Sequence, residues 1–300
     1  GYIGCELGQT FRRYGSNVTI IQSRTHLCPH EEPDVSSVLA QAFVAEGIAL
    51  VLDHKVARVA STPAGVRVVA RAEDGSECAV EGTHVLVATG RQPNTDTLGL
   101  DVAGVEMDEQ GFVRVNEYLE TNVPGIWAAG DVNGQQPFTR VCVEEGKVAY
   151  ANAFEHAHIK MERGFLGHAI FTDPQIGSVG LTERAARANG YEAVVGCKSF
   201  EQVEKAQLIG ETTGLIKFVV DRATRRLIGC HVIGPDGANL IYDAMITMRH
   251  GGTLDEIAKA VGIFPTLQEG MEGTAYDLLG ELVPRVVERP LITDLAEQRQ

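Results

Sequence analysis

The chain has 300 residues, 44% of them hydrophobic, and carries a formal net charge of -14 at pH 7. Domains of about 100–200 residues are typical, so this length predicts two or three domains. The acidic balance gives no electrostatic basis for binding nucleic acid or an anionic membrane surface, and the apolar runs are too short to predict a membrane span. We therefore expect neither nucleic acid nor a membrane among the partners.

Helices and strands are expected to alternate over the first 90 residues. A helix is predicted at 4–14, a β-branched strand at 17–22 and a second helix from Pro33 to Gly47. Further strands are predicted at 66–71 and 84–90. Such alternation indicates a layered α/β domain.

The pattern changes after residue 90. Short strands are predicted at 112–116 and 125–130, followed by a long helix at 139–158. Beyond a boundary expected at 164–168, an antiparallel strand pair at 214–221 and 226–234 predicts a separate α+β domain. Its predicted helices span 182–189, 238–250, 254–261 and 268–279.

The cysteines are scattered, with no Cys-x-x-Cys pair and no Cys/His cluster at zinc spacing. Isolated thiols of this kind are typical of a reducing compartment. The spacing therefore predicts no redox pair within the chain and no metal site. The six are Cys5, Cys28, Cys78, Cys142, Cys197 and Cys230.

A glycine turn opens the sequence. Gly1 and Gly4 fit the last two glycines of Gly-x-Gly-x-x-Gly, in which the backbone approaches a dinucleotide pyrophosphate. An ordinary strand-to-helix turn is the alternative. The ribose-contacting position, about 20 residues further on, holds Gln22 rather than an acidic residue. Arg24 could meet a 2′-phosphate, which favours NADPH over NADH; a merely solvated arginine is the alternative.

A second motif, TNVPGIWAAGD, ends at Asp131. Apolar residues lead into this carboxylate, which would lie at the carboxyl end of a strand, where open α/β sheets bind ligands. A carboxylate there can accept hydrogen bonds from ribityl or ribose hydroxyls. Taken alone, the motif would favour a simple Gly-Asp turn.

Five motifs in order give a family resemblance. GYIGxE, ATGRxPNT, TNVPGIWAAGD, FTDPxIGSVGLTE and FPTxxE closely resemble the pyridine nucleotide-disulfide oxidoreductases, from residue 1 to about 279. The family's first FAD-binding turn and its Cys-x4-Cys disulfide do not occur here, so the resemblance implies a chain truncated at its N-terminus. It also implies the division of the chain: a Rossmann-like NAD(P)-binding domain at 1–90, the C-terminal half of an FAD-binding domain at 91–163, an α+β dimerisation domain at 164–285 and a tail at 286–300.

The resemblance implies two cofactors, FAD and NAD(P)H. On the flavin side, Asp131 matches the ligand of the ribityl or pyrophosphate group. A helix N-terminus would face the flavin and stabilise negative charge that develops there. The residues matching that segment are Pro137, Phe138, Thr139 and Arg140.

On the nicotinamide side, Tyr2 matches the aromatic residue that covers the flavin until nicotinamide displaces it. Glu6 matches the glutamate near the carboxamide. Val56 and Gly90 match contacts to the adenosine and nicotinamide halves. The residues matching the pyrophosphate turn are Gly1, Ile3 and Gly4.

The FPTxxE motif departs from the family pattern. Members that handle dithiols carry a histidine, reached from the partner subunit, that exchanges a proton with a cysteine thiol and is oriented by a glutamate. Here Phe264 takes the histidine's place and Glu269 keeps the glutamate's. The resemblance thus implies a homodimer with weak dithiol chemistry, or else a tolerated substitution in an ordinary disulfide reductase.

The implied function is an FAD-dependent NAD(P)H oxidoreductase that passes hydride from nicotinamide to flavin and on to a disulfide, a metal ion or another small acceptor. Mercuric reductases are the most similar branch, although the tail lacks their cysteine pair. A soluble transhydrogenase-like or lipoamide dehydrogenase-like enzyme is the alternative, as is a non-catalytic nucleotide-binding and dimerisation module. The family and the thiol usage imply a cytoplasmic location.

Overall fold

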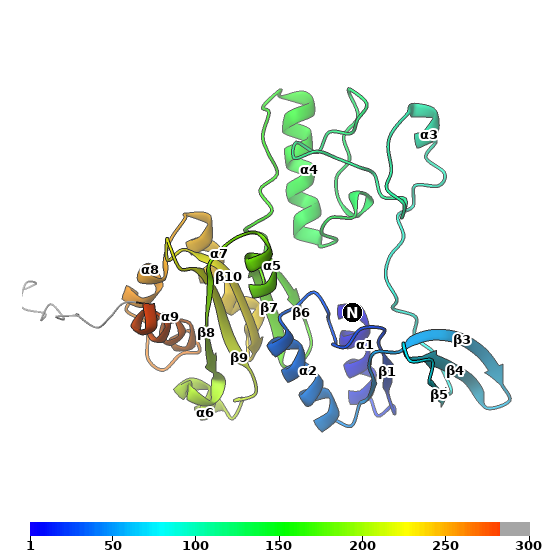
Figure 1. Ribbon diagram of the computed structural model, residues 1–300, viewed down its shortest axis with the longest axis horizontal. Coiled ribbons are helices and arrows are strands. Elements are labelled where there is room, and N and C mark those ends of the chain that lie inside the picture. The colour runs from blue at the N-terminus through cyan, green and yellow to red at the C-terminus, as the bar shows by residue number, and fades with distance from the viewer. Residues whose placement is uncertain (283–300) are drawn as a thin grey trace, which may run out of the picture.

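The computed structural model describes residues 1–282. An N-terminal α/β part and a C-terminal sheet pack together, while the segment that carries α3 (Leu100–Ala103) and α4 (Thr139–Phe154) stands apart on extended connections (Figure 1). The expected tail at 286–300 lies outside the described residues. No helix within 1–282 is long and apolar enough to cross a membrane.

The N-terminal part follows the predicted alternation. It contains α1 (Tyr2–Arg13), β1 (Thr19–Ile21), α2 (Pro33–Ala45) and β2 (Ala49–Val51), with β1 parallel to β2. Both helices end before a glycine with positive φ, as their sequences predict. The helices predicted at 4–14 and 33–47, and the strand at 17–22, are confirmed.

A three-stranded antiparallel sheet follows, formed by β3 (Lys55–Thr62), β4 (Gly65–Arg71) and β5 (Glu77–Gly82). β4 confirms the strand predicted at 66–71. The strand predicted at 84–90 is wrong: no described strand pairs with this stretch, and Val87 is 73% exposed. An apolar run becomes a strand only where its backbone groups find ladder partners.

Little regular structure occurs between α3 and α4. The strands predicted at 112–116 and 125–130 are wrong, because each is reduced to one isolated bridge, Met107 to Val113 and Glu120 to Trp127. The Asp108 carboxylate accepts hydrogen bonds from the backbone at 110 and 112 and so closes a tight turn in place of a longer ladder. α4 ends at 154 rather than 158, since residues 156 and 158 both have positive φ.

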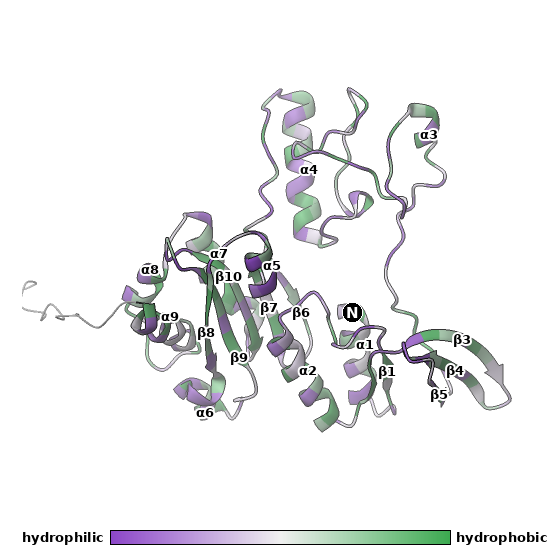
Figure 2. Cartoon of the chain, viewed as in Figure 1, coloured by the Kyte–Doolittle hydropathy of each residue, from purple (hydrophilic) through white to green (hydrophobic). Residues whose placement is uncertain are grey.

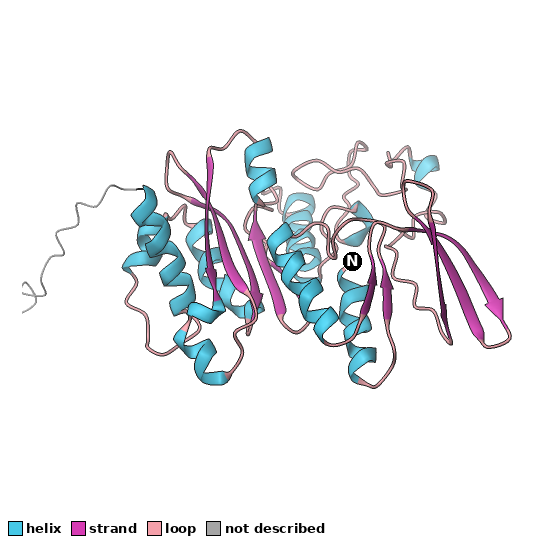
Figure 3. Cartoon of the chain, turned by 60° about the horizontal axis from the view of Figure 1, so that its bottom comes forward, coloured by secondary structure: helices cyan, strands magenta, loops and turns pink. Residues whose placement is uncertain are grey.

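The C-terminal part is a five-stranded antiparallel sheet in the order β6-β7-β10-β9-β8, with helices packed against it (Figure 3). It confirms the predicted strand pair and the predicted helices. The strands are β6 (His168–Ile170), β7 (Gln175–Gly180), β8 (Ala193–Ser199), β9 (Leu215–Asp221) and β10 (Leu227–Gly234). The helices are α5 (Glu183–Ala188), α6 (Glu204–Ile209), α7 (Gly237–Arg249), α8 (Leu254–Lys259) and α9 (Glu269–Leu282).

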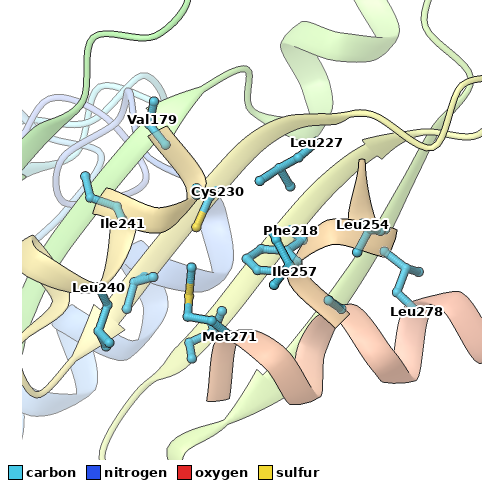
Figure 4. Close-up of a cluster of buried hydrophobic side chains, with 14 of the residues drawn as sticks. Val179, Phe218, Leu227, Cys230, Leu240, Ile241, Leu254, Ile257, Met271 and Leu278 are labelled. Atoms are coloured by element: carbon cyan, nitrogen blue, oxygen red, sulfur yellow. The ribbon is translucent and has the colours of Figure 1, made fainter. Parts of the chain in front are cut away.

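The main core lies between this sheet and its helices. Phe218 and Cys230 come from the strands, and Ile241, Leu254 and Met271 come from the helices (Figure 4). Hydrophobic residues predominate along β9 and β10, as Figure 2 shows. Burial of such side chains contributes about 25 cal/mol per Å² of apolar surface, so this core holds the part together.

A second core joins the C-terminal sheet to the N-terminal part. Leu39 and Phe43 of α2 are fully buried in one cluster with Ile170, Ile176 and Ile233 of the sheet. These two parts of the chain therefore form a single packed unit, and that packing fixes the position of the turn at 1–4 relative to β6.

Candidate functional site

The N-terminal end of α1 is the first component of the site. Its first turn holds no acidic residue. Among the described residues, a Cβ on Gly4 would meet only the Ala88 Cβ at 3.6 Å. Internal packing therefore does not require this glycine. It leaves bare backbone at a positive helix end, which suits an anionic group.

Three segments that are distant in sequence converge beside this turn. The Tyr2 and Phe138 ring centroids lie 5.7 Å apart. Phe138 also stacks on His168, with ring centroids 5.0 Å apart and planes 15° apart. The segment expected to cover the flavin and the segment expected to face it thus meet at one place, with β6 on the other side of Phe138.

Glu6 strengthens this junction. Its Oε1 accepts a hydrogen bond of 2.8 Å from the Phe171 backbone N–H, just beyond β6. The glutamate expected near the nicotinamide carboxamide therefore links α1 to the start of the C-terminal part. A carboxylate held in this way is positioned next to whatever binds the turn at 1–4.

The start of α4 is an open helix end. Phe138 is its N-cap, no side chain within residues 1–282 caps it, and its first turn is free of acidic residues. Pro137 precedes it, and Thr139 and Arg140 are exposed. The buried Oε1 of Gln136 has no hydrogen-bond partner within the described residues. Unused donors and an unused buried acceptor fit a polar, electron-accepting ring system such as a flavin.

Asp131 lies at the start of a short 3-10 helix, η1 (Asp131–Asn133). Its Oδ2 is 2.7 Å from the Arg91 Nη1, and its Oδ1 accepts from the Cys142 Sγ at 3.3 Å. Burial and then the neighbouring Asp131 raise the pKa of Cys142, so this thiol stays neutral and donates. The carboxylate is only half exposed and already ordered.

The sequence did not reveal which residues hold the turn around Asp131 in place. Glu145 of α4 is 1% exposed; its Oε2 accepts from the Gly130 N–H at 2.5 Å and from the Asn133 amide at 2.8 Å. Its Oε1 pairs with the Arg163 Nη1 at 2.6 Å. A glutamate on an otherwise ordinary helix gave no sequence signal, yet it holds the Gly130 backbone on one side of Asp131 and the Asn133 side chain on the other.

The residues expected to contact the ribose and the rest of the nucleotide lie in a more exposed part of the chain. The Gln22 Oε1 accepts from the Arg24 N–H at 3.3 Å, and the Arg24 carbonyl accepts from the Asp53 N–H at 3.0 Å. The Arg24 side chain itself is exposed to solvent. Val56 lies on β3 and is 42% exposed, and Gly90 adopts a φ of 126°. The structure gives neither of these two a contact with the turn at 1–4.

A buried polar network lies behind Phe138, and sequence reasoning missed it. The Glu31 Oε1 lies 2.7 Å from the His168 Nε2. The Glu31 Oε2 accepts a hydrogen bond of 2.5 Å from the Ser178 hydroxyl. Burial opposes its ionisation, but the His168 and Ser178 hydrogen bonds outweigh this and hold the pKa of Glu31 below its usual value. His231 is also buried nearby, which lowers the pKa of its imidazole.

The FPTxxE motif occupies an exposed position. Phe264 is 65% exposed and is followed by a cis peptide bond to Pro265. The Glu269 Oε2 accepts from the Thr266 N–H at 3.1 Å, so this carboxylate closes the turn before α9. The structure does not join Phe264 and Glu269 to the Tyr2–Phe138 junction within this chain.

Comparison with known proteins gives a consistent result. Residues 1–157 match the family model described as pyridine nucleotide-disulphide oxidoreductase, and residues 167–275 match that family's dimerisation domain. The chain is 34% identical over 272 residues to a mercuric reductase of Staphylococcus aureus, covering 91% of this chain and 50% of that protein. It is 35% identical over 280 residues to a dihydrolipoyl dehydrogenase of Thermus scotoductus, and the match covers 93% of this chain and 60% of that protein.

Solved structures agree with this match. LpdA from Mycobacterium tuberculosis superposes with a TM-score of 0.83 at 27% identity, covering 93% of this chain and 60% of that one. The Cu(II) complex of the HOCl-induced flavoprotein disulfide reductase RclA from Escherichia coli gives a TM-score of 0.81 at 26% identity, covering 93% and 62%. The chain therefore spans between half and about three fifths of these relatives.

Proposed function

Because the chain belongs to the pyridine nucleotide-disulphide oxidoreductase family, we propose that it acts in FAD-dependent oxidation of NAD(P)H. Hydride would pass from nicotinamide to flavin, and electrons would leave to a disulfide, a metal ion or another acceptor. The observation that carries this is the junction of Tyr2 and Phe138, which lie at the starts of α1 and α4. When bound there, FAD supplies the hydride-accepting chemistry that side chains lack.

The chain's own residues bind and orient the nucleotide. Gly1, Ile3 and Gly4 would present backbone N–H groups to the pyrophosphate, and Glu6 would hold the carboxamide end. Tyr2 would move off Phe138 to admit the nicotinamide ring. Gln22, Arg24, Val56 and Gly90 are proposed to line the remaining length of the cofactor, with Arg24 favouring NADPH.

On the flavin side, Asp131 would accept hydrogen bonds from the ribityl or pyrophosphate part, held in place by Arg91 and by the backbone that Glu145 fixes. The residues proposed to face the ring system are Pro137, Phe138, Thr139 and Arg140. The free N–H groups at the start of α4 would stabilise negative charge that develops there, because preorganised dipoles act without reorganisation.

Phe264 affects which electron acceptor the enzyme can use. A phenyl ring cannot carry a proton to or from a thiol, and Glu269 is occupied by the Thr266 N–H. We propose a mercuric reductase-like enzyme with weak dithiol activity, in keeping with the mercuric reductase among its relatives. A transhydrogenase-like or lipoamide dehydrogenase-like enzyme is the second candidate, and a nucleotide-binding and dimerisation module without catalysis is the third.

A homodimer is proposed from the dimerisation domain and from large apolar side chains that are exposed within it. Large exposed apolar surfaces mark contact sites. These side chains, with their exposed fractions, are Tyr242 at 63%, Ile246 at 50%, Val261 at 97%, Ile263 at 78% and Phe264 at 65%. The domain limits at 1–90, 91–163 and 164–285, and a cytoplasmic location, belong to the same proposal.

Steady-state NADPH oxidation in the presence of FAD tests the proposal. Oxidised lipoamide, glutathione disulfide, Hg(II) and an NAD analogue are offered separately as acceptors, with NADPH consumption measured for each. Turnover with Hg(II) above that with either disulfide supports the mercuric reductase-like proposal. Turnover only with the NAD analogue supports the transhydrogenase-like candidate. NADPH binding without turnover on any acceptor supports the module.

A further inference from the structure

Two cysteines that are 23 residues apart in sequence meet inside the N-terminal part. The Cys28 Sγ donates to the Cys5 Sγ across 3.7 Å. Cys5 lies in α1, directly after the glycine turn, and Cys28 lies in the loop before α2. The sequence spacing predicted no thiol pair, because nothing in it shows that this loop folds back onto α1.

The surroundings of the pair are apolar. Cys5 is fully buried and Cys28 is 4% exposed, in one cluster with Leu27, Val35 and Phe43. Each thiol is the other's only side-chain hydrogen-bond partner among the described residues. An apolar setting disfavours two separate thiolates and accommodates an uncharged disulfide without loss of any other polar contact.

We propose that Cys5 and Cys28 are a modification site at which a small two-electron oxidant, hydrogen peroxide, forms a reversible intramolecular disulfide. In the first step the Cys5 sulfur attacks the peroxide oxygen, the O–O bond breaks, and Cys5 becomes a sulfenic acid as water or hydroxide leaves. In the second step the Cys28 sulfur attacks the Cys5 sulfur and expels a second water. Two thiols lose two electrons and two protons, and one peroxide becomes two waters.

The order of attack follows from the contact between the two thiols. The hydrogen bond from Cys28 outweighs burial and lowers the pKa of Cys5, whereas donating that bond, together with burial, raises the pKa of Cys28. Cys5 is therefore the better nucleophile and Cys28 the resolving thiol.

Bonding requires a small movement of the loop that carries Cys28. A disulfide has an S–S length of about 2.05 Å, so the two sulfurs must approach by about 1.7 Å. Cys5 is fixed by the helix, but Cys28 belongs to an irregular loop that also carries Arg24 and Glu31. Oxidation would thus tie the nucleotide-binding turn to the loop proposed to read the 2′-phosphate.

Disulfide mapping of the folded chain tests the site without any cofactor, so its outcome is independent of the proposed function. The purified protein is treated with H₂O₂, blocked with an alkylating reagent and digested with trypsin. Arg12, Arg13 and Arg24 separate the two cysteines into different peptides. We expect one linked pair, Cys5 to Cys28, in most molecules, and its loss after treatment with dithiothreitol.

Two variants sharpen the test. Cys28→Ser removes the resolving thiol, so Cys5 should be trapped as a sulfenic acid by dimedone. Cys197→Ser, at an exposed cysteine distant in sequence, should still form the Cys5–Cys28 link at the wild-type rate. The proposal is overturned if peroxide-treated wild-type protein yields Cys5 and Cys28 both alkylated as free thiols, or linked only to other cysteines.

Discussion

The His168 Nε2 lies 2.7 Å from the Glu31 Oε1 while the same imidazole stacks on Phe138. One side chain therefore connects the loop before α2, the first strand of the C-terminal sheet and the segment at the start of α4. Because the Glu31 carboxylate is buried and also accepts from Ser178, this connection is rigid. We expect the position of Phe138, and with it the proposed flavin face, to depend on the charge of Glu31.

The charge of Glu31 gives a pH dependence. Its folded pKa is depressed below the unfolded value of about 4.3, so the stabilisation is present above that value and is lost as pH falls through the folded pKa. Glu31→Gln should lower the free energy of unfolding by about 1–3 kcal/mol at pH 7. Urea unfolding from pH 7 down to pH 3 measures this, and a difference from wild type that does not shrink as the pH falls would contradict it.

A buried cation joins the N-terminal part to the C-terminal sheet. The Lys217 Nζ is 3.0 Å from the Glu32 Oε2 and 2.7 Å from the Asp34 Oδ2, and Glu32 is 2% exposed. Lys217→Met should cost about 3–5 kcal/mol, because it leaves a buried carboxylate without its counter-charge. The measurement is the free energy of unfolding in urea.

The controls for Lys217 separate charge from packing. Lys198→Met breaks the ion pair with Asp277, whose side chain is 64% exposed, and should cost at most about 1 kcal/mol. Adding Glu32→Gln to Lys217→Met should recover part of the loss. Equal losses in the two single lysine variants would contradict the assignment of a buried pair.

A substitution at Gly4 separates an effect on nucleotide binding from an effect on stability. A Cβ there meets only ordinary contact, so Gly4→Ala should stabilise α1 by about 0.5–1 kcal/mol while obstructing the pyrophosphate. We expect NADPH affinity, measured by calorimetric titration, to fall at least about tenfold, or about 1.4 kcal/mol. Gly280→Ala in α9, where a Cβ would meet nothing within 4 Å among the described residues, is the control and should bind NADPH as wild type does. Unchanged NADPH affinity in Gly4→Ala would place the pyrophosphate elsewhere.

Arg24 tests the choice of nucleotide. Its exposed guanidinium would form a charge-assisted contact to the 2′-phosphate, worth about 1.5–3 kcal/mol. Arg24→Ala should weaken NADPH binding roughly 10- to 100-fold at that energy and leave NADH binding unchanged. Arg71→Ala, which removes a surface pair with Glu77, is the control for general electrostatics. Equal losses for NADPH and NADH would contradict the assignment.

Phe264 tests the acceptor. Because the ring is largely exposed, Phe264→His should fold normally and restore a proton carrier beside Glu269. In the complete enzyme, with the family's Cys-x4-Cys disulfide present, turnover with oxidised lipoamide should rise about 10²-fold or more, the usual contribution of a positioned acid or base. Tyr276→His, at another exposed aromatic residue of the same domain, should give no gain. Activity that does not rise at any pH would show that the missing histidine is not limiting.

Local patterns predicted much of the fold. The helices ended by Gly15 and Gly47 and the strand pair in the C-terminal sheet each depend on neighbouring residues and are confirmed. The strand expected at 84–90 failed because a strand needs a paired neighbour, which periodicity does not reveal. The strands expected at 112–116 and 125–130 are each reduced to one isolated bridge, because tight turns take the place of a longer ladder.

Sequence reasoning could propose site residues only where they belong to a motif. Gly4 and Phe138 were found from their motifs, and the structure brings their segments together. The Glu31–His168 contact, the Glu145 support of the turn at Asp131 and the Cys5–Cys28 contact all join residues from different elements. Their partners are set by tertiary packing, so no spacing rule along the chain could identify them.

The central claim is that the turn at 1–4 holds a nicotinamide directly beside a flavin that faces Phe138. Anaerobic titration of the FAD-loaded protein with NADPH, following the visible absorbance of the flavin, tests this most directly. The account predicts stoichiometric loss of the oxidised-flavin spectrum in the wild type. A protein that binds both FAD and NADPH, yet whose flavin stays oxidised, would contradict it.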